Sequence, residues 1–113
     1  MSKRINLFEK NIDIVIDSKY STDETVIGNY AGKPVYRKIF NLNNLYVAPQ
    51  MWVETNIPKQ NFDVILSART IGTTQYPIAF DRYTDTNHCA IMHFRNVALE
   101  FSFVLVEYTK VTN

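Results

Sequence analysis

The stretch Val97-Ala98-Leu99-Glu100-Phe101-Ser102-Phe103-Val104-Leu105-Val106-Glu107-Tyr108-Thr109 decides the fold class of this chain. Its residues alternate as expected for a β-strand, with one face formed by Val97, Leu99, Phe101, Phe103 and Leu105. The other face begins with Glu100 and Ser102 and turns apolar at Val104 and Val106. Because this end of the strand has two apolar faces, we expect a second sheet or a neighbouring subunit to cover it.

Short runs of alternating or β-branched residues fill the rest of the chain. The sequence predicts strands over residues 11–17, 24–30, 33–41, 45–47, 51–54, 62–71, 75–80, 89–94 and 97–109. Turns or polar loops separate them at residues 31–32, 48–50, 56–61, 72–74 and 81–87. No window has a sustained helical period, so the pattern predicts an all-β fold with little helix. Many short strands with frequent turns favour an antiparallel β-sandwich or a jelly-roll-like barrel.

Length and composition indicate one small domain. The 113 residues predict a single β-sandwich domain over residues 11–113, with residues 1–10 as an N-terminal arm. A net charge of +1 argues against a strongly basic nucleic-acid binder. Cys89 is the only cysteine, so no intramolecular disulfide can form. The polar start of the chain and the lack of a long apolar run predict neither a signal peptide nor a membrane span, which indicates synthesis in a cytoplasm.

The densest polar group is the most obvious place for a metal site, and it comprises Asp81, Asp85, Asn87, His88, Cys89 and His93. A zinc site would use His88, Cys89 and His93, but the odd separation of the two histidines puts them on opposite faces of a strand. A calcium loop would need a Gly and a bidentate Glu, which the run Asp81-x-x-x-Asp85-x-Asn87 lacks. The sequence therefore predicts no metal and no cofactor.

Catalytic patterns are weak as well. Cys89 and His93 would lie about 13 Å apart along a strand, too far for a nucleophile and its base. There is no nucleophile elbow, phosphate loop or dinucleotide fingerprint. The carboxylate pairs Asp23/Glu24 and Asp81/Asp85 lie in polar loops; a glycosidase dyad is the alternative to solvated carboxylates there. We therefore expect a protein that is not an enzyme.

Exposed aromatic residues are better candidates for function. Trp52, Tyr76 and Tyr83 lie near predicted loops, where aromatic rings can stack on sugars or fill protein interfaces. Together with Asp81 and Asp85 they are the predicted ligand or receptor contacts. A basic group on the predicted hairpin is expected to be solvated and not to bind nucleic acid; it consists of Lys33, Arg37 and Lys38.

Two segments resemble a known family. The first reads Tyr20-Ser21-Thr22-Asp23-Glu24-Thr25-Val26-Ile27-Gly28-Asn29-Tyr30-Ala31-Gly32-Lys33-Pro34-Val35-Tyr36-Arg37-Lys38, and the second Glu107-Tyr108-Thr109-Lys110-Val111-Thr112-Asn113. They resemble the two ends of a C-terminal β module in tailed-phage and prophage virion proteins of Gram-positive hosts. Tyr30 stands where the family pattern has Trp, and the turn is one residue shorter. The hairpin motif comprises Gly28, Tyr30, Gly32, Lys33, Pro34 and Tyr36.

The motif is typical of structural hairpin chemistry and not of a catalytic site. Gly32 can supply a positive φ at the turn, and Pro34 restricts the returning strand. In the proteins that the chain resembles, such modules end tail-fibre or baseplate proteins, which are usually trimeric and in some cases bind host-surface saccharides. The resemblance therefore implies a homotrimeric virion protein that contacts other virion proteins and a receptor. The alternatives are a small capsid decoration or head-fibre accessory protein and, less favoured, a carbohydrate-acting enzyme.

Overall fold

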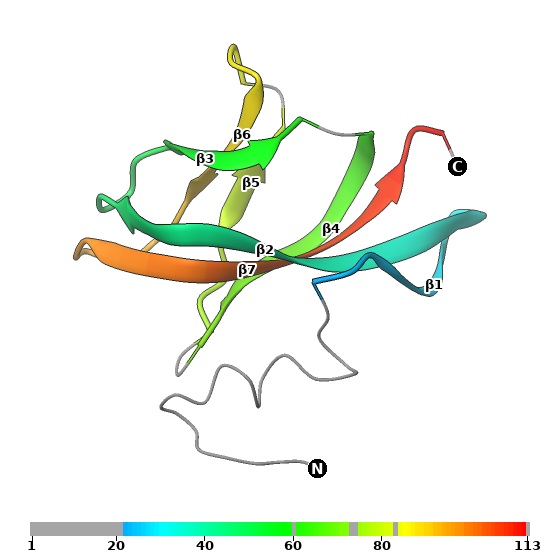
Figure 1. Cartoon of the computed structure of the whole chain (residues 1–113), viewed down its shortest axis with the longest axis horizontal. Coiled ribbons are helices and arrows are strands. Elements are labelled where there is room, and N and C mark those ends of the chain that lie inside the picture. The colour runs from blue at the N-terminus through cyan, green and yellow to red at the C-terminus, as the bar shows by residue number, and fades with distance from the viewer. Residues whose placement is uncertain (1–21, 60, 73–74, 83, 113) are drawn as a thin grey trace.

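The computed structural model describes residues 22–59, 61–72, 75–82 and 84–112, and these form two antiparallel β-sheets without a helix (Figure 1). The strands are β1 (Thr25–Tyr30), β2 (Lys33–Val47), β3 (Val53–Pro58), β4 (Phe62–Ile71), β5 (Ala79–Asp81), β6 (His88–Met92) and β7 (Leu99–Lys110). The strand predicted over residues 11–17 and the arm predicted over residues 1–10 lie outside the described residues. No helix in the described part of the chain is long and apolar enough to cross a bilayer.

The predicted all-β sandwich is confirmed. One sheet has four strands in the order β1-β2-β7-β4, and the other has three in the order β3-β6-β5. β7 pairs with both β2 and β4, so the stretch that decided the fold class lies in the middle of the larger sheet. Figure 1 shows this sheet curling, with the long strands β2 and β7 side by side through its centre and the smaller sheet across one part of it.

The main hydrophobic core unites the two sheets. It is formed by Phe40, Leu42, Val47, Ile57, Phe62, Ile78, Cys89, Ile91, Phe101, Val104, Val106 and Tyr108. At its centre the ring of Phe62 meets three other aromatic rings, with centroids 6.4 Å from Phe40, 5.7 Å from Phe80 and 4.7 Å from Tyr108. These rings come from β2, β4, β5 and β7, so this cluster joins strands of both sheets.

β7 is buried on both faces, as its sequence predicts. Val104 and Val106 belong to the main core, whereas Leu105 joins Ile39 and Ile71 in a second cluster; Leu105 is 0% exposed. This burial is already present in a single chain, so the strand by itself does not require a neighbouring subunit.

The prediction that the odd-numbered residues from Val97 to Leu105 share one face is wrong. Phe101 packs into the main core, Phe103 packs against the second cluster, and Val97 precedes the strand and is exposed. The pairing with β2 shifts between these positions, because Asn41 lies opposite Phe103 but Leu45 lies opposite Phe101. The irregular pairing therefore lies where the packing of β7 changes from one core cluster to the other.

The bulge in β2 joins two strands that the sequence predicts as separate. Asn43 and Asn44 both adopt positive φ angles, 57° and 55°, which asparagine tolerates better than most residues. The backbone N–H of Asn43 donates to Oδ1 of Asn41 (2.8 Å), and Ser102 Oγ donates to Oδ1 of Asn44 (2.5 Å). These bonds hold the bulge, so the chain continues as one strand where the sequence pattern indicates a break.

The bounds of two other strands also differ from the prediction. β3 extends to Pro58 and pairs there with His88, so part of the predicted loop 56–61 is strand. The strand predicted over residues 75–80 is reduced to β5, preceded by a single bridge between Pro77 and Arg69, because Pro77 cannot donate to a ladder. β4, by contrast, matches its predicted bounds.

The β1–β2 hairpin is closed by a two-residue turn. Tyr30 pairs with Lys33, and the residues between them have positive φ: 51° at Ala31 and 80° at Gly32. Positive φ at both positions is the type I′ turn, which matches the twist of the strands. Gly32 therefore does what the sequence predicts, whereas Ala31 holds a conformation that its Cβ disfavours.

Replacing Ala31 with asparagine is therefore expected to stabilise the protein. Asn-Gly is the favoured pair in a type I′ turn, and relief of the strain should raise the free energy of unfolding by about 0.5–1 kcal/mol. Urea denaturation would measure this change. Ala98→Asn, in a segment without a positive φ, is the control and should give no gain. An Ala31→Asn protein no more stable than the wild type would show that the turn is not strained.

Candidate binding surface

The polar residues considered for a metal site are spread along the three-stranded sheet. Asp81 ends β5, Asp85 and Asn87 are exposed in the loop that follows, and His88 begins β6. Nδ1 of His88 lies 3.1 Å from a carboxylate oxygen of Glu54. Among the described residues, no group of three His, Cys, Asp or Glu side chains is placed to hold a metal ion.

Cys89 is part of the core. Its side chain is 0% exposed, and burial raises the pKa of its thiol to about 11. The thiol is therefore protonated near neutral pH, whereas a nucleophilic cysteine must be a thiolate. Cys89 therefore acts as a small apolar residue that packs in the core.

His93 is a structural residue that links two loops. It is 0% exposed, and its Nδ1 lies 3.1 Å from the backbone N of Arg95. A backbone N–H can only donate, so Nδ1 accepts and the ring proton lies on Nε2. Nε2 donates in turn to the carbonyl of Val47, at 3.1 Å. The neutral ring thus bridges the end of β2 to the segment after β6.

A second bond ties the same two loops together. Nε2 of Gln50, in the β2–β3 loop, donates to Oδ1 of Asn96, in the β6–β7 loop, at 3.0 Å. The loops are therefore adjacent and fixed to each other at one end of the sandwich. Five large apolar side chains are exposed on or beside them: Tyr46, Met51, Trp52, Phe94 and Val97. We call these five residues the apolar end.

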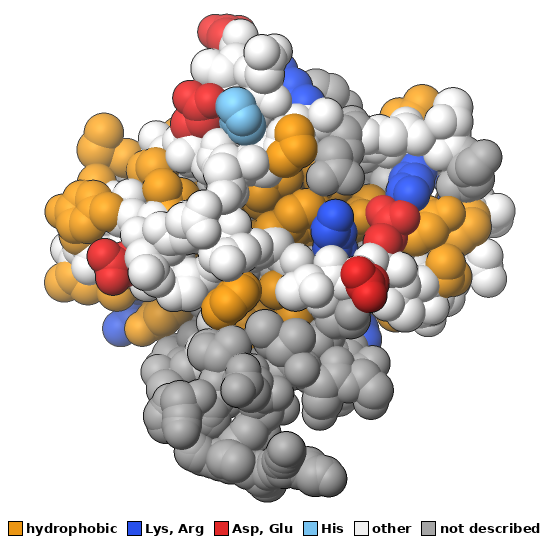
Figure 2. Space-filling model, in the orientation of Figure 1, with side chains coloured by type: hydrophobic (Ala, Val, Ile, Leu, Met, Phe, Trp, Pro, Cys, Tyr) orange, Lys and Arg blue, Asp and Glu red, His pale blue; other side chains and the backbone are white. Residues whose placement is uncertain are grey.

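Figure 2 shows hydrophobic side chains gathered at this end of the molecule, on the left of the view, with few charges between them. Trp52 is 50% exposed and Phe94 58% exposed. Such a concentration of exposed apolar surface on a small protein is typical of a contact surface for another molecule.

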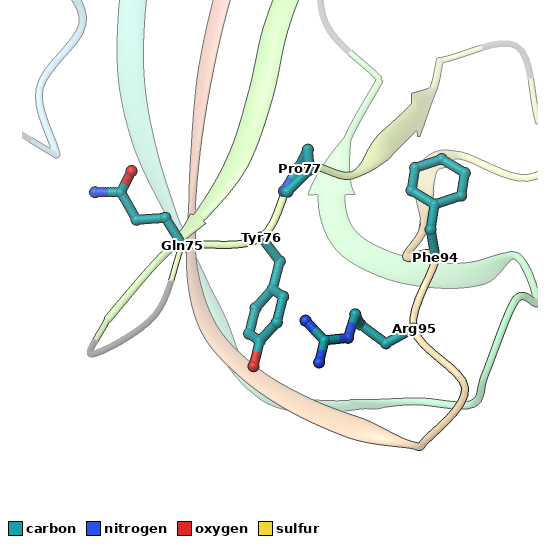
Figure 3. Close-up of a pocket in the computed structure, with 5 residues that line it drawn as sticks. All are labelled: Gln75, Tyr76, Pro77, Phe94 and Arg95. Carbon is teal, nitrogen blue, oxygen red and sulfur yellow. The ribbon is translucent and has the colours of Figure 1, made fainter.

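A shallow hollow of about 260 Å³ lies beside the apolar end. Its walls come from the β4–β5 connection and the β6–β7 loop, and the residues that line it are Gln75, Tyr76, Pro77, Phe94 and Arg95 (Figure 3). The side chain of Arg95 points toward Tyr76, with its Cζ 5.5 Å from the ring centroid. Such a distance is typical of a cation–π contact.

Tyr76 is held firmly in this wall. Its backbone N donates to Oγ1 of Thr70 (2.9 Å), its carbonyl accepts from the Thr70 backbone N (3.0 Å), and its ring lies 6.0 Å from Phe101. Tyr76 is half-buried, so it forms a rigid wall of the hollow with only part of its ring open to a ligand.

The structure brings only some of the predicted contact residues together. Trp52 and Tyr76 lie at the end of the sandwich where β6 finishes, whereas Asp81 and Asp85 lie toward the end where β6 begins. Tyr83 lies outside the described residues. Sequence reasoning missed Phe94 and Arg95, because it placed Phe94 inside a strand; the adjacent polar run Arg95-Asn96 was the signal that the strand ends earlier.

The hairpin motif and the chain end form one packed cluster, which we call the hairpin–tail cluster: Glu24, Lys33, Tyr36, Tyr108 and Lys110. The rings of Tyr36 and Tyr108 stack at 6.0 Å, and Nζ of Lys110 lies 4.2 Å from the Tyr36 centroid. Nζ of Lys33 donates to the Lys110 carbonyl at 2.9 Å. The two segments that resemble the phage family are therefore in direct contact.

Glu24 accepts hydrogen bonds from two other residues of this cluster. Tyr108 donates its hydroxyl to one carboxylate oxygen, and Nζ of Lys110 donates to the other at 2.6 Å. Burial tends to raise the pKa of Glu24, but the bonds from Lys110 and Tyr108 outweigh it and the pKa is lowered. Burial, together with the bond to Glu24, raises the pKa of Tyr108. The cluster contains a fixed ion pair and a protonated phenol, consistent with a structural role.

We expect this carboxylate to make stability depend on pH. Because the folded-state pKa of Glu24 is lowered, its stabilisation is present above the ordinary glutamate pKa of 4.5 and is lost as pH falls through and below that value. The free energy of unfolding of Glu24→Gln should therefore fall less than that of the wild type between pH 6 and pH 3. Urea titrations at both pH values would measure this. Equal losses in both proteins would contradict a role for Glu24, and exposed Glu100→Gln is the control.

The three cations of the basic group on the hairpin contact other side chains of the protein. Lys33 pairs with Asp63 at 2.9 Å, and Arg37 pairs with Glu107 at 2.8 Å. Nζ of Lys38 lies 5.0 Å from the centroid of the Phe40 ring. Two of the three cations thus bind carboxylates of neighbouring strands.

Comparisons with known proteins give no family. No family model, no curated protein and no solved structure matches this chain.

Proposed function

We propose that this chain is a non-enzymatic virion protein of a tailed phage, a tail-fibre or baseplate adhesion module that binds the host surface through the apolar end. The observation that carries this proposal is the exposure of Trp52 and Phe94 on two loops that His93 ties together. An exposed aromatic pair on a rigid support loses little conformational entropy on binding, and aromatic faces stack on sugar rings.

The resemblance to phage virion modules supports the same proposal. Its two segments contact each other through Tyr36, Tyr108 and Glu24. Residues that hold a hairpin and a chain end together are those expected to recur where a module keeps its framework and changes its loops. We therefore expect the ligand-binding surface in the loops at the opposite end of the molecule, the apolar end.

We further propose that the protein acts as a homo-oligomer, most simply the trimer that is usual at fibre ends. Every residue of β1 is exposed, including Val26, Ile27 and Tyr30, and β1 is an edge strand of its sheet. An apolar edge strand is a surface that a neighbouring copy or another virion protein would cover. Sedimentation at micromolar concentration should give about three times the chain mass of 13.1 kDa; a monomer would contradict the proposal.

Retention on cell walls tests the adhesion function. The wild-type chain should co-sediment with purified walls from at least one strain in a panel of Gram-positive bacteria. Trp52→Ala should weaken retention at least tenfold, which is the usual effect of removing an aromatic hot spot, about 2 kcal/mol. Val111→Ala changes an exposed apolar residue that belongs neither to the apolar end nor to β1; it is the control and should retain binding.

The outcomes separate the alternatives. Binding of the wild type to emptied phage capsids but not to walls would favour capsid decoration and overturn the adhesion proposal. Release of sugars from the walls that Asp81→Asn or Asp85→Asn abolishes would identify a glycan hydrolase instead.

A further inference from the structure

Among the residues that the structure describes, Arg95 is the one charged residue that lines the hollow beside the apolar end. The other lining residues are Gln75, Tyr76, Pro77 and Phe94, so the described part of the lining contains no carboxylate. None of the ion pairs formed between described residues includes Arg95. The hollow therefore presents a positive charge without a counter-ion from the part of the chain that the structure describes.

The guanidinium is also held in place. Its Cζ lies 5.5 Å from the Tyr76 ring centroid, and the backbone of Arg95 is fixed by the buried ring of His93. A guanidinium that already lies over an aromatic ring loses less freedom when it binds an anion than one on a mobile side chain. Figure 3 shows Phe94 next to Arg95 on the same loop, with its ring on a different side of the hollow from the guanidinium.

We propose that this hollow binds a saccharide that carries an acidic group, a carboxylate or a phosphate. The acidic group pairs with Arg95, whose planar fork matches two oxygens of a carboxylate or a phosphate. The sugar ring lies against the exposed ring of Phe94, as aromatic faces accept the apolar faces of sugars. This inference rests on the proposed adhesion function and adds the chemical class of its ligand.

Titration with defined sugars tests the inference. The probes are a tetrasaccharide that contains glucuronic acid, glucose 6-phosphate, and a neutral tetrasaccharide and glucose as their uncharged partners. The backbone amide signals of Phe94 and Arg95 report binding in nuclear magnetic resonance spectra. At least one acidic probe should bind about tenfold more tightly than its neutral partner, as expected for one charge-assisted contact. The tighter of the two acidic probes identifies the group as carboxylate or phosphate.

Substitutions of Arg95 test whether its guanidinium causes the preference for acidic sugars. Arg95→Gln should remove the preference for the acidic probe, and Arg95→Lys should keep part of it, because lysine retains the charge but not the fork. Lys59→Gln removes an exposed charge beyond the far end of β3 and should leave the preference unchanged. The preference should also weaken as salt rises.

Three results would overturn the inference: equal binding of acidic and neutral sugars, a preference that survives in Arg95→Gln, or no binding of any probe. If walls still retain the wild type in these cases and Trp52→Ala abolishes that retention, the adhesion function stands and only the ligand class is wrong. If walls never retain the wild type, the proposed function fails and the inference fails with it.

Discussion

Phe62→Ala is expected to lower the free energy of unfolding by about 3–5 kcal/mol, the usual cost of truncating a buried phenylalanine. Phe62 is 5% exposed, and its ring contacts rings of β2, β5 and β7. The substitution leaves a cavity where the two sheets meet. Small domains are stable by only about 5–15 kcal/mol, so a large part of the total is lost. Urea denaturation followed by circular dichroism would measure the change.

The matched control for this change is Phe94→Ala. It removes the same atoms from a side chain that is 58% exposed, so stability should change by no more than about 0.5 kcal/mol. A loss of less than about 1 kcal/mol in Phe62→Ala would show that this ring does not join the sheets. Phe94→Ala has a second use, because the same variant should weaken retention on cell walls while remaining folded.

His93→Phe is expected to have the second largest effect, a loss of about 2–4 kcal/mol. Phenylalanine keeps most of the ring volume but removes the His93 hydrogen bonds to the partly buried N–H of Arg95 and to the buried carbonyl of Val47, and loss of the partner of a buried polar group costs about 1–3 kcal/mol. Wall retention measured on the folded fraction should fall as well, because the two loops of the apolar end lose one of their links.

His93→Gln tests the cause of that loss. The side-chain amide of glutamine can place a donor near the position of Nε2, facing the Val47 carbonyl, but cannot at the same time place its oxygen at the position of Nδ1, so its cost should lie between zero and that of His93→Phe. If His93→Phe and His93→Gln destabilise the protein equally, the effect comes from packing and not from the two hydrogen bonds.

The strands that the sequence predicted well are those whose pattern is local. β4 was correct at both ends, because Phe62 and Ile71 fall between clear polar and glycine breaks. The two-residue turn at Ala31-Gly32 was correct because a glycine next to a short break is a local signal. β2 was divided wrongly, since Asn43 and Asn44 suggest a turn and only the bonds from Asn41 and Ser102 show that they form a bulge.

The candidate surface was harder to predict because it depends on distant contacts. Trp52 was expected to be exposed and is, but nothing local showed that its loop lies beside Asn96. His93 was considered only as a metal ligand or a catalytic base. Its partner Val47 is 46 residues away in the sequence, so its role as a link between loops follows only from the fold.

Mapping the contact surface of wall glycan tests the central claim most directly. Soluble fragments released from walls that retain the protein would be titrated into the isotope-labelled chain, and backbone amide shifts would be followed residue by residue. The proposal predicts shifts confined to residues 46–52 and 93–98, with smaller ones around Tyr76. Shifts centred on β1 or on the loop after β5, or no shifts at all, would contradict the claim that the apolar end is the adhesive surface.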